Sequence, residues 1–282
     1  MSKLEYTGER FVPEYKTNSI MALEHYHRYM FVMPYCQNKN VLDIACGAGY
    51  GSELMSRRAE KVLGADIDPK AIEYCSFHYT KDNLKFEVKS VDKIDYPQKT
   101  FDIITCFETI EHISEQQQKD AVALFGNVLK DDGILFISTP SLASPLHIKD
   151  NKYHIHELSQ NEFYNLLSLH FKYVNIIGQS VCLCSIIGGS PNKSGCDCRV
   201  EISQDYKIGD CKYLMAICSN KEIPDINASS VYVDTSMATL IKLTKLRNKI
   251  GGLIKLYNFG IAILAKICPN KKWKQKIEKL KW

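Results

Sequence analysis

The most constraining feature of this chain is a short apolar run that ends in a glycine-rich turn. Residues 41–45 (VLDIA) read as a buried strand, Gly47, Gly49 and Gly51 follow at every second position, and 52–58 continue as a helix. Small residues let the backbone approach a ligand closely, and the N-terminus of the following helix offers free N–H groups. The pattern predicts a nucleotide-like ligand at this turn, although a glycine turn alone does not identify that ligand.

Strand and helix signals alternate through the middle of the chain. Apolar runs at 41–45, 61–65, 84–88, 101–107 and 134–138 are separated by amphipathic stretches at 52–58, 69–79 and 116–129. This alternation predicts an α/β fold with a parallel sheet covered by helices on both faces. A helix from 160 to about 170, announced by a capping box that starts at Ser159, and a strand pair at 171–178 and 212–219 would complete a seven-stranded sheet.

Two carboxylates flank the glycine turn. Asp43 lies inside the first strand, where a buried carboxylate needs partners, either a ligand ammonium, the amides of the turn or a purely structural network. Asp66 lies 19 residues after Gly47, at the end of the next strand, where it can accept hydrogen bonds from both hydroxyls of a ribose. NAD-dependent enzymes share that feature, but they favour Gly-x-Gly-x-x-Gly, whereas this turn reads Gly-x-Gly-x-Gly.

Acidic and histidine side chains follow the fourth and fifth strands. Glu108, Glu111 and His112 are spaced to share one face of a short helix at the carboxyl end of a central strand, where Glu111 or His112 could take a proton. Helix capping or tethering of a lid is the alternative. The loop at 141–155 and the residues just after it should overhang the same crevice with His147, His154, His156 and Glu157.

This histidine loop has three readings: proton abstraction from a substrate, binding of a metal ion as His-x-His with a nearby carboxylate, or ordinary loop packing. Cysteine pairs at 182/184 and 196/198 have a one-residue gap, whereas zinc sites favour two to four residues between ligands. No metal ion is therefore predicted.

The series of motifs from about 40 to 220 resembles the class I S-adenosylmethionine (SAM)-dependent methyltransferases. Segments 6–13 (YTGERFVP), 24–29 (EHYHRY), 107–113 (FETIEHI) and 138–140 (STP) resemble bacterial methyltransferases found with polysaccharide and glycolipid biosynthesis enzymes. The resemblance implies a Rossmann-like, doubly wound, mostly parallel sheet, SAM as the methyl donor, and a sugar hydroxyl or a related small metabolite as the acceptor.

Site residues follow from the matched motifs. The cofactor-binding residues are expected to be Asp43, Ala45, Gly47, Gly49, Asp66, Ile67, Ser90, Val91, Asp92, Phe107 and Glu108. The catalytic residues are expected among Glu111, His112, His154 and Glu157. Many relatives carry an acid after the third strand that bonds the adenine amino group; here Ser90, the Val91 backbone and Asp92 all remain candidates. Arg10 could pair with the SAM carboxylate, with an anionic substrate, or with a nearby surface acid.

Charge divides the chain unevenly. Residues 241–282 hold eleven Lys and one Arg against the single acid Glu278 (+11), whereas the preceding 240 residues hold 24 basic and 31 acidic side chains (−7). A mildly acidic body argues against a surface for nucleic acid. The expected organisation is a lid segment at 1–38, a methyltransferase domain at 39–220, and a linker with a basic helical extension at 221–282.

The basic extension has three readings. Lysines beside apolar and aromatic residues suit a helix in a membrane interface, whereas the opposite charge of the body favours packing on the enzyme itself or in a homodimer. Eleven cysteines without a disulfide-like pattern, no secretory signal and no transmembrane stretch favour a cytoplasmic protein, with peripheral contact at the inner membrane face as an addition.

The leading functional hypothesis is an O-methyltransferase for a small molecule or saccharide in glycan biosynthesis. Within enzymes, the alternative is a methyltransferase for a phosphorylated compound or an amine. From a different class, the chain could be a catalytically silent methyltransferase fold that binds a partner, and an NAD-dependent oxidoreductase is a further option. The intact glycine turn and Asp66 argue against a silent fold.

Overall fold

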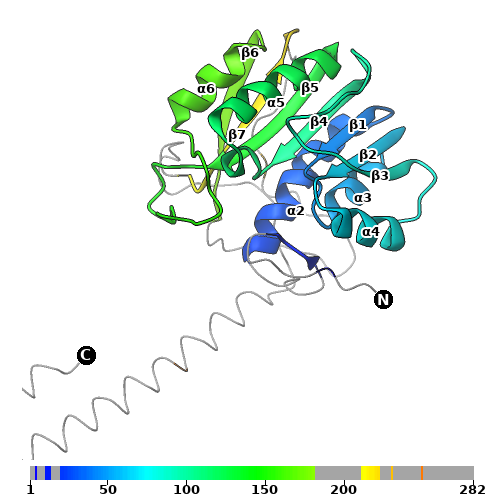
Figure 1. The fold of residues 1–282 in the computed structure, drawn as a ribbon, viewed down its shortest axis with the longest axis horizontal. Helices are drawn as coiled ribbons and strands as arrows, with labels where there is room; N and C mark the ends of the chain where they lie inside the picture. Colours follow the sequence, from blue (N-terminus) through cyan, green and yellow to red (C-terminus); the bar gives the residue numbers. More distant parts are fainter. Residues whose placement is uncertain are drawn as a thin grey trace, which may run out of the picture. The chain divides into compact units, whose positions relative to one another are not determined.

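The computed structural model describes residues 10–13, 20–181 and 211–222, together with Leu4, Ser230 and Lys249. Within them, a seven-stranded sheet has the order β3-β2-β1-β4-β5-β7-β6 (Figure 1). Its strands are β1 Asn40–Ile44, β2 Lys61–Asp66, β3 Leu84–Val88, β4 Phe101–Phe107, β5 Leu129–Pro140, β6 Tyr173–Gln179 and β7 Tyr213–Ser219. The predicted Rossmann-like, doubly wound α/β fold is confirmed.

Six of the seven strands run in the same direction, and β7 runs opposite to them. β1 to β5 pair in parallel, whereas β7 runs antiparallel between β5 and β6. Strand order reverses between β1 and β4, and ligands of such sheets bind outside the carboxyl ends of the strands at that reversal. Because Tyr213 at the start of β7 pairs with Pro140 at the end of β5, the antiparallel strand also delivers residues to this edge.

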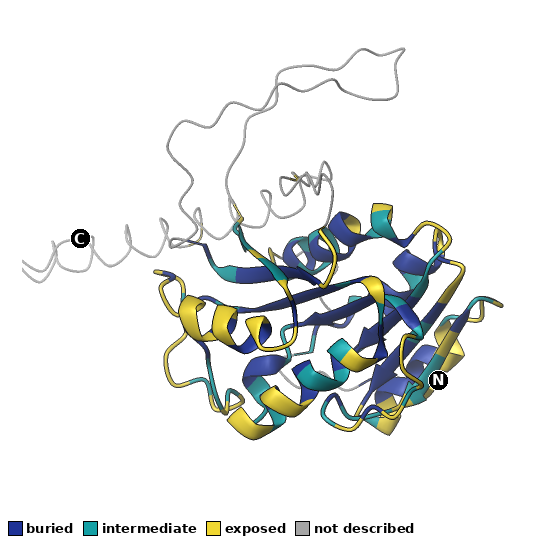
Figure 2. Ribbon diagram, turned by 90° about the horizontal axis from the view of Figure 1, so that it is seen from above, coloured by how far each residue is buried: buried dark blue, intermediate teal, exposed yellow. Residues whose placement is uncertain are grey.

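Helices cover both faces of the sheet (Figure 1). α2 Ile20–Val32, α3 Tyr50–Ser56 and α4 Pro69–His78 contribute to one apolar core, and α5 Glu115–Val128 and α6 Gln160–Ser168 contribute to the other. The short 3-10 turns η1 Met33–Cys36 and η2 Ile110–His112 follow α2 and β4. Figure 2 shows the central strands mostly buried between these two layers, whereas the edge strands β3 and β6 are only partly buried. Burial on both faces explains why the strands read as continuous apolar runs.

Local sequence signals set several element boundaries. Ser159 and Glu162 form the predicted capping box, and α6 begins directly after Ser159. A second capping box, of Ser114 and Gln117, begins α5. β5 starts five residues earlier than the strand predicted from 134, because Leu129 already pairs with Phe101 before an irregularity in the ladder.

Close helix packing explains one of the turn glycines. A Cβ atom at Gly51 would lie 2.1 Å from the ring of Tyr29, so only glycine lets α3 approach α2 this closely. The helix α2, which lies within the expected lid segment at 1–38, is thereby placed over the glycine turn.

Several predictions concern residues outside the described ones. They include the cysteine pairs at 182/184 and 196/198 and most of the linker and basic extension at 221–282. The three domain boundaries therefore stay predictions. In the part of the chain that is described, no helix combines the length and the apolar character that a membrane span needs.

Candidate active site

A cavity of about 660 Å³ opens at the carboxyl edge of the sheet. One side is formed by the glycine turn and the end of β2, and the opposite side by the end of β4, η2, the histidine loop and the start of β7. The first side includes Ala45, Cys46, Gly47, Ala48 and Asp66, and the second includes Phe107, Glu108, Glu111, His112, His147, Asn151, Tyr153, His154, Lys212 and Tyr213.

The turn after β1 is held in left-handed backbone conformations. Gly47 and Gly49 have φ of 57° and 73°, and Ala45 reaches 60° without being glycine. The two glycines face different surroundings. A Cβ at Gly47 would meet only the Arg10 side chain, at 3.8 Å, whereas a Cβ at Gly49 would lie 2.7 Å from the sulfur of Cys75 and 3.0 Å from Phe86. Gly47 therefore borders the cavity, and Gly49 serves packing.

Asp66 connects the end of β2 to the glycine turn. One carboxylate oxygen accepts the Gly47 N–H at 2.9 Å, and the other accepts the Asp68 N–H at 2.9 Å. The carboxylate is mostly buried but borders the cavity. These bonds fix its direction and leave carboxylate lone pairs for ligand hydroxyls.

Arg10 lies beside this carboxylate. Its guanidinium bonds Asp68 at 2.8 Å and lies 3.7 Å from Asp66. Both carboxylates lie at or just after the end of β2. Next to it, the buried Phe11 packs edge-on against Tyr50 of α3. Residues 10 and 11 thus line the cavity beside the glycine turn and the end of β2.

Asp43 forms a network of hydroxyl groups. Its carboxylate accepts bonds from Ser52 at 2.6 Å, Thr105 at 2.7 Å and Tyr29 at 3.2 Å. The side chain is 1% exposed and lies behind the residues that line the cavity. Burial raises the pKa of Asp43 to about 6, against the lowering effect of these hydroxyls. Of the three partner sets weighed from the sequence, these contacts are those of a structural network, and contact of Asp43 with a ligand stays a prediction.

The remaining residues predicted at the cofactor lie outside the lining of this cavity. Ser90 donates a hydrogen bond to Asp92, which also accepts one from Gln117 at 2.8 Å. Val91 is buried, and Ile67 is 68% exposed next to Asp66. All four follow β2 and β3, on the same edge of the sheet as the cavity. Their contact with adenine stays a prediction.

Glu108 and Glu111 occupy different environments. Glu108 has φ of 48°, so it precedes η2 in a left-handed conformation and does not share a helix face with Glu111, contrary to the spacing argument. Its carboxylate accepts the Ser138 hydroxyl at 2.6 Å. Glu111 is 1% exposed and accepts the Thr139 hydroxyl at 3.2 Å. Burial, and then the charge of Glu108, raise the pKa of Glu111 well above its usual range.

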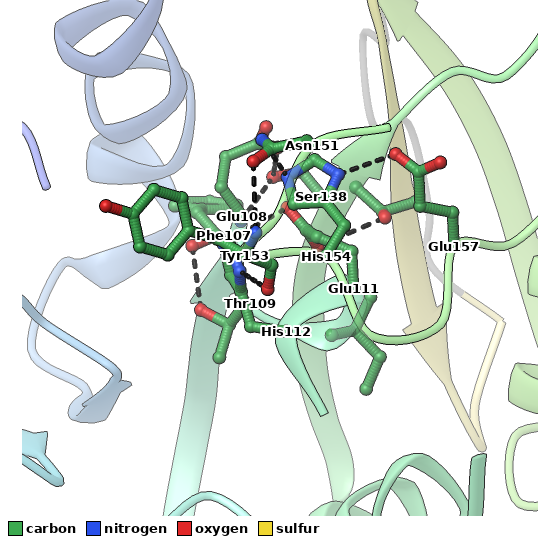
Figure 3. Close-up of polar contacts among 12 residues, drawn as sticks. Phe107, Glu108, Thr109, Glu111, His112, Ser138, Asn151, Tyr153, His154 and Glu157 are labelled. Atoms are coloured by element: carbon green, nitrogen blue, oxygen red, sulfur yellow. Dashed lines mark hydrogen bonds and ion pairs between the residues drawn. The ribbon is translucent and has the colours of Figure 1, made fainter. Parts of the chain in front are cut away.

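Two histidines of the wall formed by η2 and the histidine loop lie together (Figure 3). The rings of His112 and His154 are 5.0 Å apart and nearly perpendicular. His112 donates its Nδ1–H to the Tyr153 carbonyl at 2.9 Å, and His154 donates its Nδ1–H to Glu157 at 2.6 Å. Although burial opposes it, hydrogen bonds from His154 and then His147 lower the pKa of Glu157, which keeps it ionised.

Gln118 of α5 fastens the histidine loop to η2. Its side-chain amide donates to the carbonyls of Ile110 and His156 at 2.7 and 2.8 Å, and its oxygen is bonded to the His156 ring at 2.9 Å. The Glu111 carbonyl accepts the N–H groups of Ile155 and His156. The loop is therefore held against the end of β4 as one frame.

Sequence reasoning missed several residues that line the cavity. His25 of α2 is bonded to the Tyr50 hydroxyl at 2.7 Å. Burial, then the charges of Arg28 and Lys212, lower the pKa of His25 well below its usual range, so its imidazole is neutral. Tyr213 is the first residue of β7, and Lys212 immediately precedes it. Only the segment 24–29 had been marked in the sequence, for its resemblance.

Comparisons with known proteins agree with this geometry. The methyltransferase domain family model matches residues 41–133. A probable S-adenosylmethionine-dependent methyltransferase of Mycobacterium tuberculosis is 26% identical over 83% of this chain and 81% of its own length. A ubiquinone biosynthesis O-methyltransferase of Actinobacillus pleuropneumoniae is 32% identical over 36% of this chain and 45% of its own length. The structure of a SAM-dependent methyltransferase from Archaeoglobus fulgidus matches with a TM-score of 0.54 and 17% identity, covering 73% and 96% of the two chains.

The sheet order, the glycine turn and the matched methyltransferase domain define the class of this protein. It is a class I SAM-dependent methyltransferase, and SAM is its cofactor.

Proposed function

We propose that this enzyme methylates a hydroxyl group of a saccharide or a related small molecule. SAM lies against the glycine turn and Asp66, and the acceptor lies against Glu111, His112 and His154. The observation that carries the proposal is that both groups of residues line the same cavity. A displacement at carbon requires the acceptor atom close to the methyl group and in line with sulfur, and one cavity with two chemically different walls provides that arrangement.

The acceptor side supports oxygen as the methylated atom. A hydroxyl must lose its proton, and this wall carries two imidazoles with Nδ1 held by acceptors and a buried carboxylate. Proton removal by positioned groups contributes about 10²–10⁴-fold to rate. The relative from Actinobacillus pleuropneumoniae is named an O-methyltransferase, which agrees with this choice. A role in glycan or surface-polysaccharide synthesis rests on the resemblance of segments 6–13 and 24–29.

A phosphorylated acceptor is the second candidate, and Arg28 favours it. This buried arginine lies 3.6 Å from Glu108 and 4.7 Å from the ring of Tyr213, two residues that line the cavity. Its Nε and Nη2 atoms are buried and have no hydrogen-bond partner among the described residues. Guanidinium groups bind phosphate with several donors at once. A small rotation of the Arg28 side chain would turn these two unpaired donors toward a phosphate group of an acceptor in the cavity.

Methyl-labelled SAM tests the proposal directly. The protein is incubated with nucleotide sugars, free sugars, phenols, sugar phosphates and amines, and the product is identified by mass spectrometry. We expect label on a hydroxyl oxygen of a sugar-containing acceptor, with release of S-adenosylhomocysteine. Label on nitrogen alone, or SAM binding without transfer to any acceptor, would contradict the proposal, and the second result would favour a silent scaffold.

The basic extension at 241–282 is proposed to bring the enzyme to the inner face of a membrane. Its +11 charge beside apolar residues suits anionic lipid, and a lipid-linked glycan acceptor would make that location useful. Sedimentation with anionic liposomes compares the full chain with one that ends at Ala238. Equal sedimentation of both forms would rule out membrane contact, and loss of a dimer in the shorter form would favour packing instead.

A further inference from the structure

We propose that Glu111, His112 and His154 bind a divalent transition-metal ion on the acceptor side of the cavity. Each side chain offers one ligand atom, and the three atoms lie within 4.8 Å of one another. His112 Nε2 and Glu111 Oε1 are already 4.0 Å apart. Ligands at about 2.1 Å from a common ion, at the angles of a tetrahedral or octahedral site, are about 3.0–3.4 Å from one another, so binding requires these side chains to approach by about 1 Å.

Both imidazoles are held through Nδ1, which leaves Nε2 as the candidate ligand nitrogen. His112 donates its Nδ1–H to the Tyr153 carbonyl, and His154 donates its Nδ1–H to the Glu157 carboxylate. Metal-binding histidines almost always donate the other ring N–H to a carbonyl or a carboxylate, which fixes the tautomer and the ring direction. The His154 Nε2 accepts a bond from the Asn151 amide at 3.0 Å, and an ion would take the place of that proton.

The local charge also favours a cation. Glu108 and Glu111 both line the cavity, and Glu111 is 1% exposed; among the described side chains, the donor that an observed hydrogen bond gives its carboxylate is the neutral hydroxyl of Thr139. A buried carboxylate requires a cation or several donors for compensation. Among the described groups, Arg28 is 3.6 Å from Glu108 rather than paired with Glu111.

A rigid frame presents these ligands. Glu111 and His112 belong to η2, directly after β4, and His154 comes from the loop that Gln118 ties to η2. The Glu111 carbonyl is itself bonded to the backbone of this loop. Two imidazoles and one carboxylate on one side of an open cavity leave coordination positions free, an arrangement suited to first-row ions from Mn²⁺ to Zn²⁺.

This ion would activate the acceptor, an inference that rests on the proposed O-methylation. The acceptor hydroxyl binds the ion, which lowers the hydroxyl pKa, and the proton passes to a solvent water. The oxygen then attacks the methyl carbon of SAM. The carbon–sulfur bond breaks with both electrons going to sulfur, which yields a methyl ether and S-adenosylhomocysteine. The charge of the ion does not change.

Titration with Mn²⁺ tests the site without any acceptor. Mn²⁺ is paramagnetic and prefers carboxylate and imidazole to thiolate, which matters in a chain with eleven cysteines. The full-length protein is treated with EDTA, desalted and titrated, and the loss of the free-ion electron paramagnetic resonance signal is measured. We expect one Mn²⁺ bound per chain.

Three conservative variants identify the ligands. Glu111→Gln, His112→Gln and His154→Gln should each weaken Mn²⁺ at least tenfold, and Glu157→Gln, which removes the acceptor of the His154 Nδ1–H, by about 10- to 100-fold. His78→Gln is the control, because His78 lies in α4 and is bonded to the Tyr74 carbonyl away from the cavity. If Glu111→Gln does not fold, the 28% exposed His112 carries the test.

Outcomes for the site and for the proposed function are separate. Absence of Mn²⁺ binding, or equal affinity in wild type and the three ligand variants, would overturn the metal site even if the enzyme methylates hydroxyls. Loss of methyl transfer after EDTA, with recovery on Mn²⁺ and unchanged SAM affinity, supports the catalytic role. Full transfer in the metal-free protein would overturn that role, while failure to methylate any hydroxyl with Mn²⁺ bound would overturn the proposed function.

Discussion

Asp66 at the end of β2 accepts the backbone N–H of Gly47 through a 2.9 Å hydrogen bond, so one carboxylate joins two neighbouring strand ends at the cavity. This contact holds the glycine turn open toward the cavity and points the carboxylate along the same edge. The Asp68 N–H fixes the other oxygen. Two backbone N–H groups therefore hold the direction of the Asp66 carboxylate.

Replacing Gly49 should damage folding rather than cofactor binding alone. The φ of 73° and contacts of 2.7 and 3.0 Å to Cys75 and Phe86 leave no room for a side chain. Gly49→Val is expected to cost about 3 kcal/mol or more of unfolding free energy, measured with urea. As a control, Gly126→Ala in α5 meets nothing nearer than 3.6 Å and should stabilise by up to about 1 kcal/mol. Unchanged stability of the valine variant would show that the turn is not packed as described.

Asp43 should make stability depend on pH. Burial raises its pKa from an ordinary value of 3.8 to about 6, so between these values the folded state holds a proton that the unfolded state has lost. Its contribution is therefore present below about pH 4 and is lost as pH rises through 6, by about 3 kcal/mol at 1.36 kcal/mol per unit. Asp43→Asn should remove this slope in urea unfolding at pH 4, 5, 6 and 7. Parallel curves for the two proteins would contradict the assignment.

Arg10 should slow the release of SAM. It bridges Asp66 and Asp68 beside the glycine turn, and it is 18% exposed, so the expected effect is modest. Arg10→Met is expected to speed SAM dissociation by about two- to fivefold in stopped flow, consistent with up to about 1 kcal/mol for a partly exposed pair. Lys81→Met is the control, because its 2.8 Å pair with Glu53 does not border the cavity. Equal dissociation rates in all three proteins would exclude a covering role for residue 10.

The fold was predictable because its signals are local. Apolar runs between glycine, aspartate and proline mark the strands, and the capping box at Ser159 marks the start of α6. Asp66, His112 and His154 could be placed at the cavity because each follows the end of a parallel strand in the chain, where such sheets bind ligands.

Other site residues depend on contacts between distant segments. Lys212 and Tyr213 reach the cavity only because β7 is inserted antiparallel beside β5, a register that no local pattern encodes. In the sequence, Gln118 is indistinguishable from other polar helix residues. Its amide connects the histidine loop to η2 because α5 packs beside both segments. Glu108 does not lie on the expected helix face because its backbone is left-handed. Glutamate rarely adopts that conformation, so the residue type did not predict it.

The central claim is that one cavity holds SAM on the Asp66 side and activates the acceptor on the His112 side. The most direct measurement compares Asp66→Ala and His112→Ala by calorimetric titration with SAM and by single-turnover methyl transfer at saturating SAM. We expect Asp66→Ala to weaken SAM by about 1.5–3 kcal/mol, the range for a hydrogen bond to a charged group. His112→Ala should keep SAM affinity and lose about 10²–10⁴-fold in the transfer rate. Equal loss of SAM affinity in both variants, or full transfer by His112→Ala, would contradict the division of the cavity into these two sides.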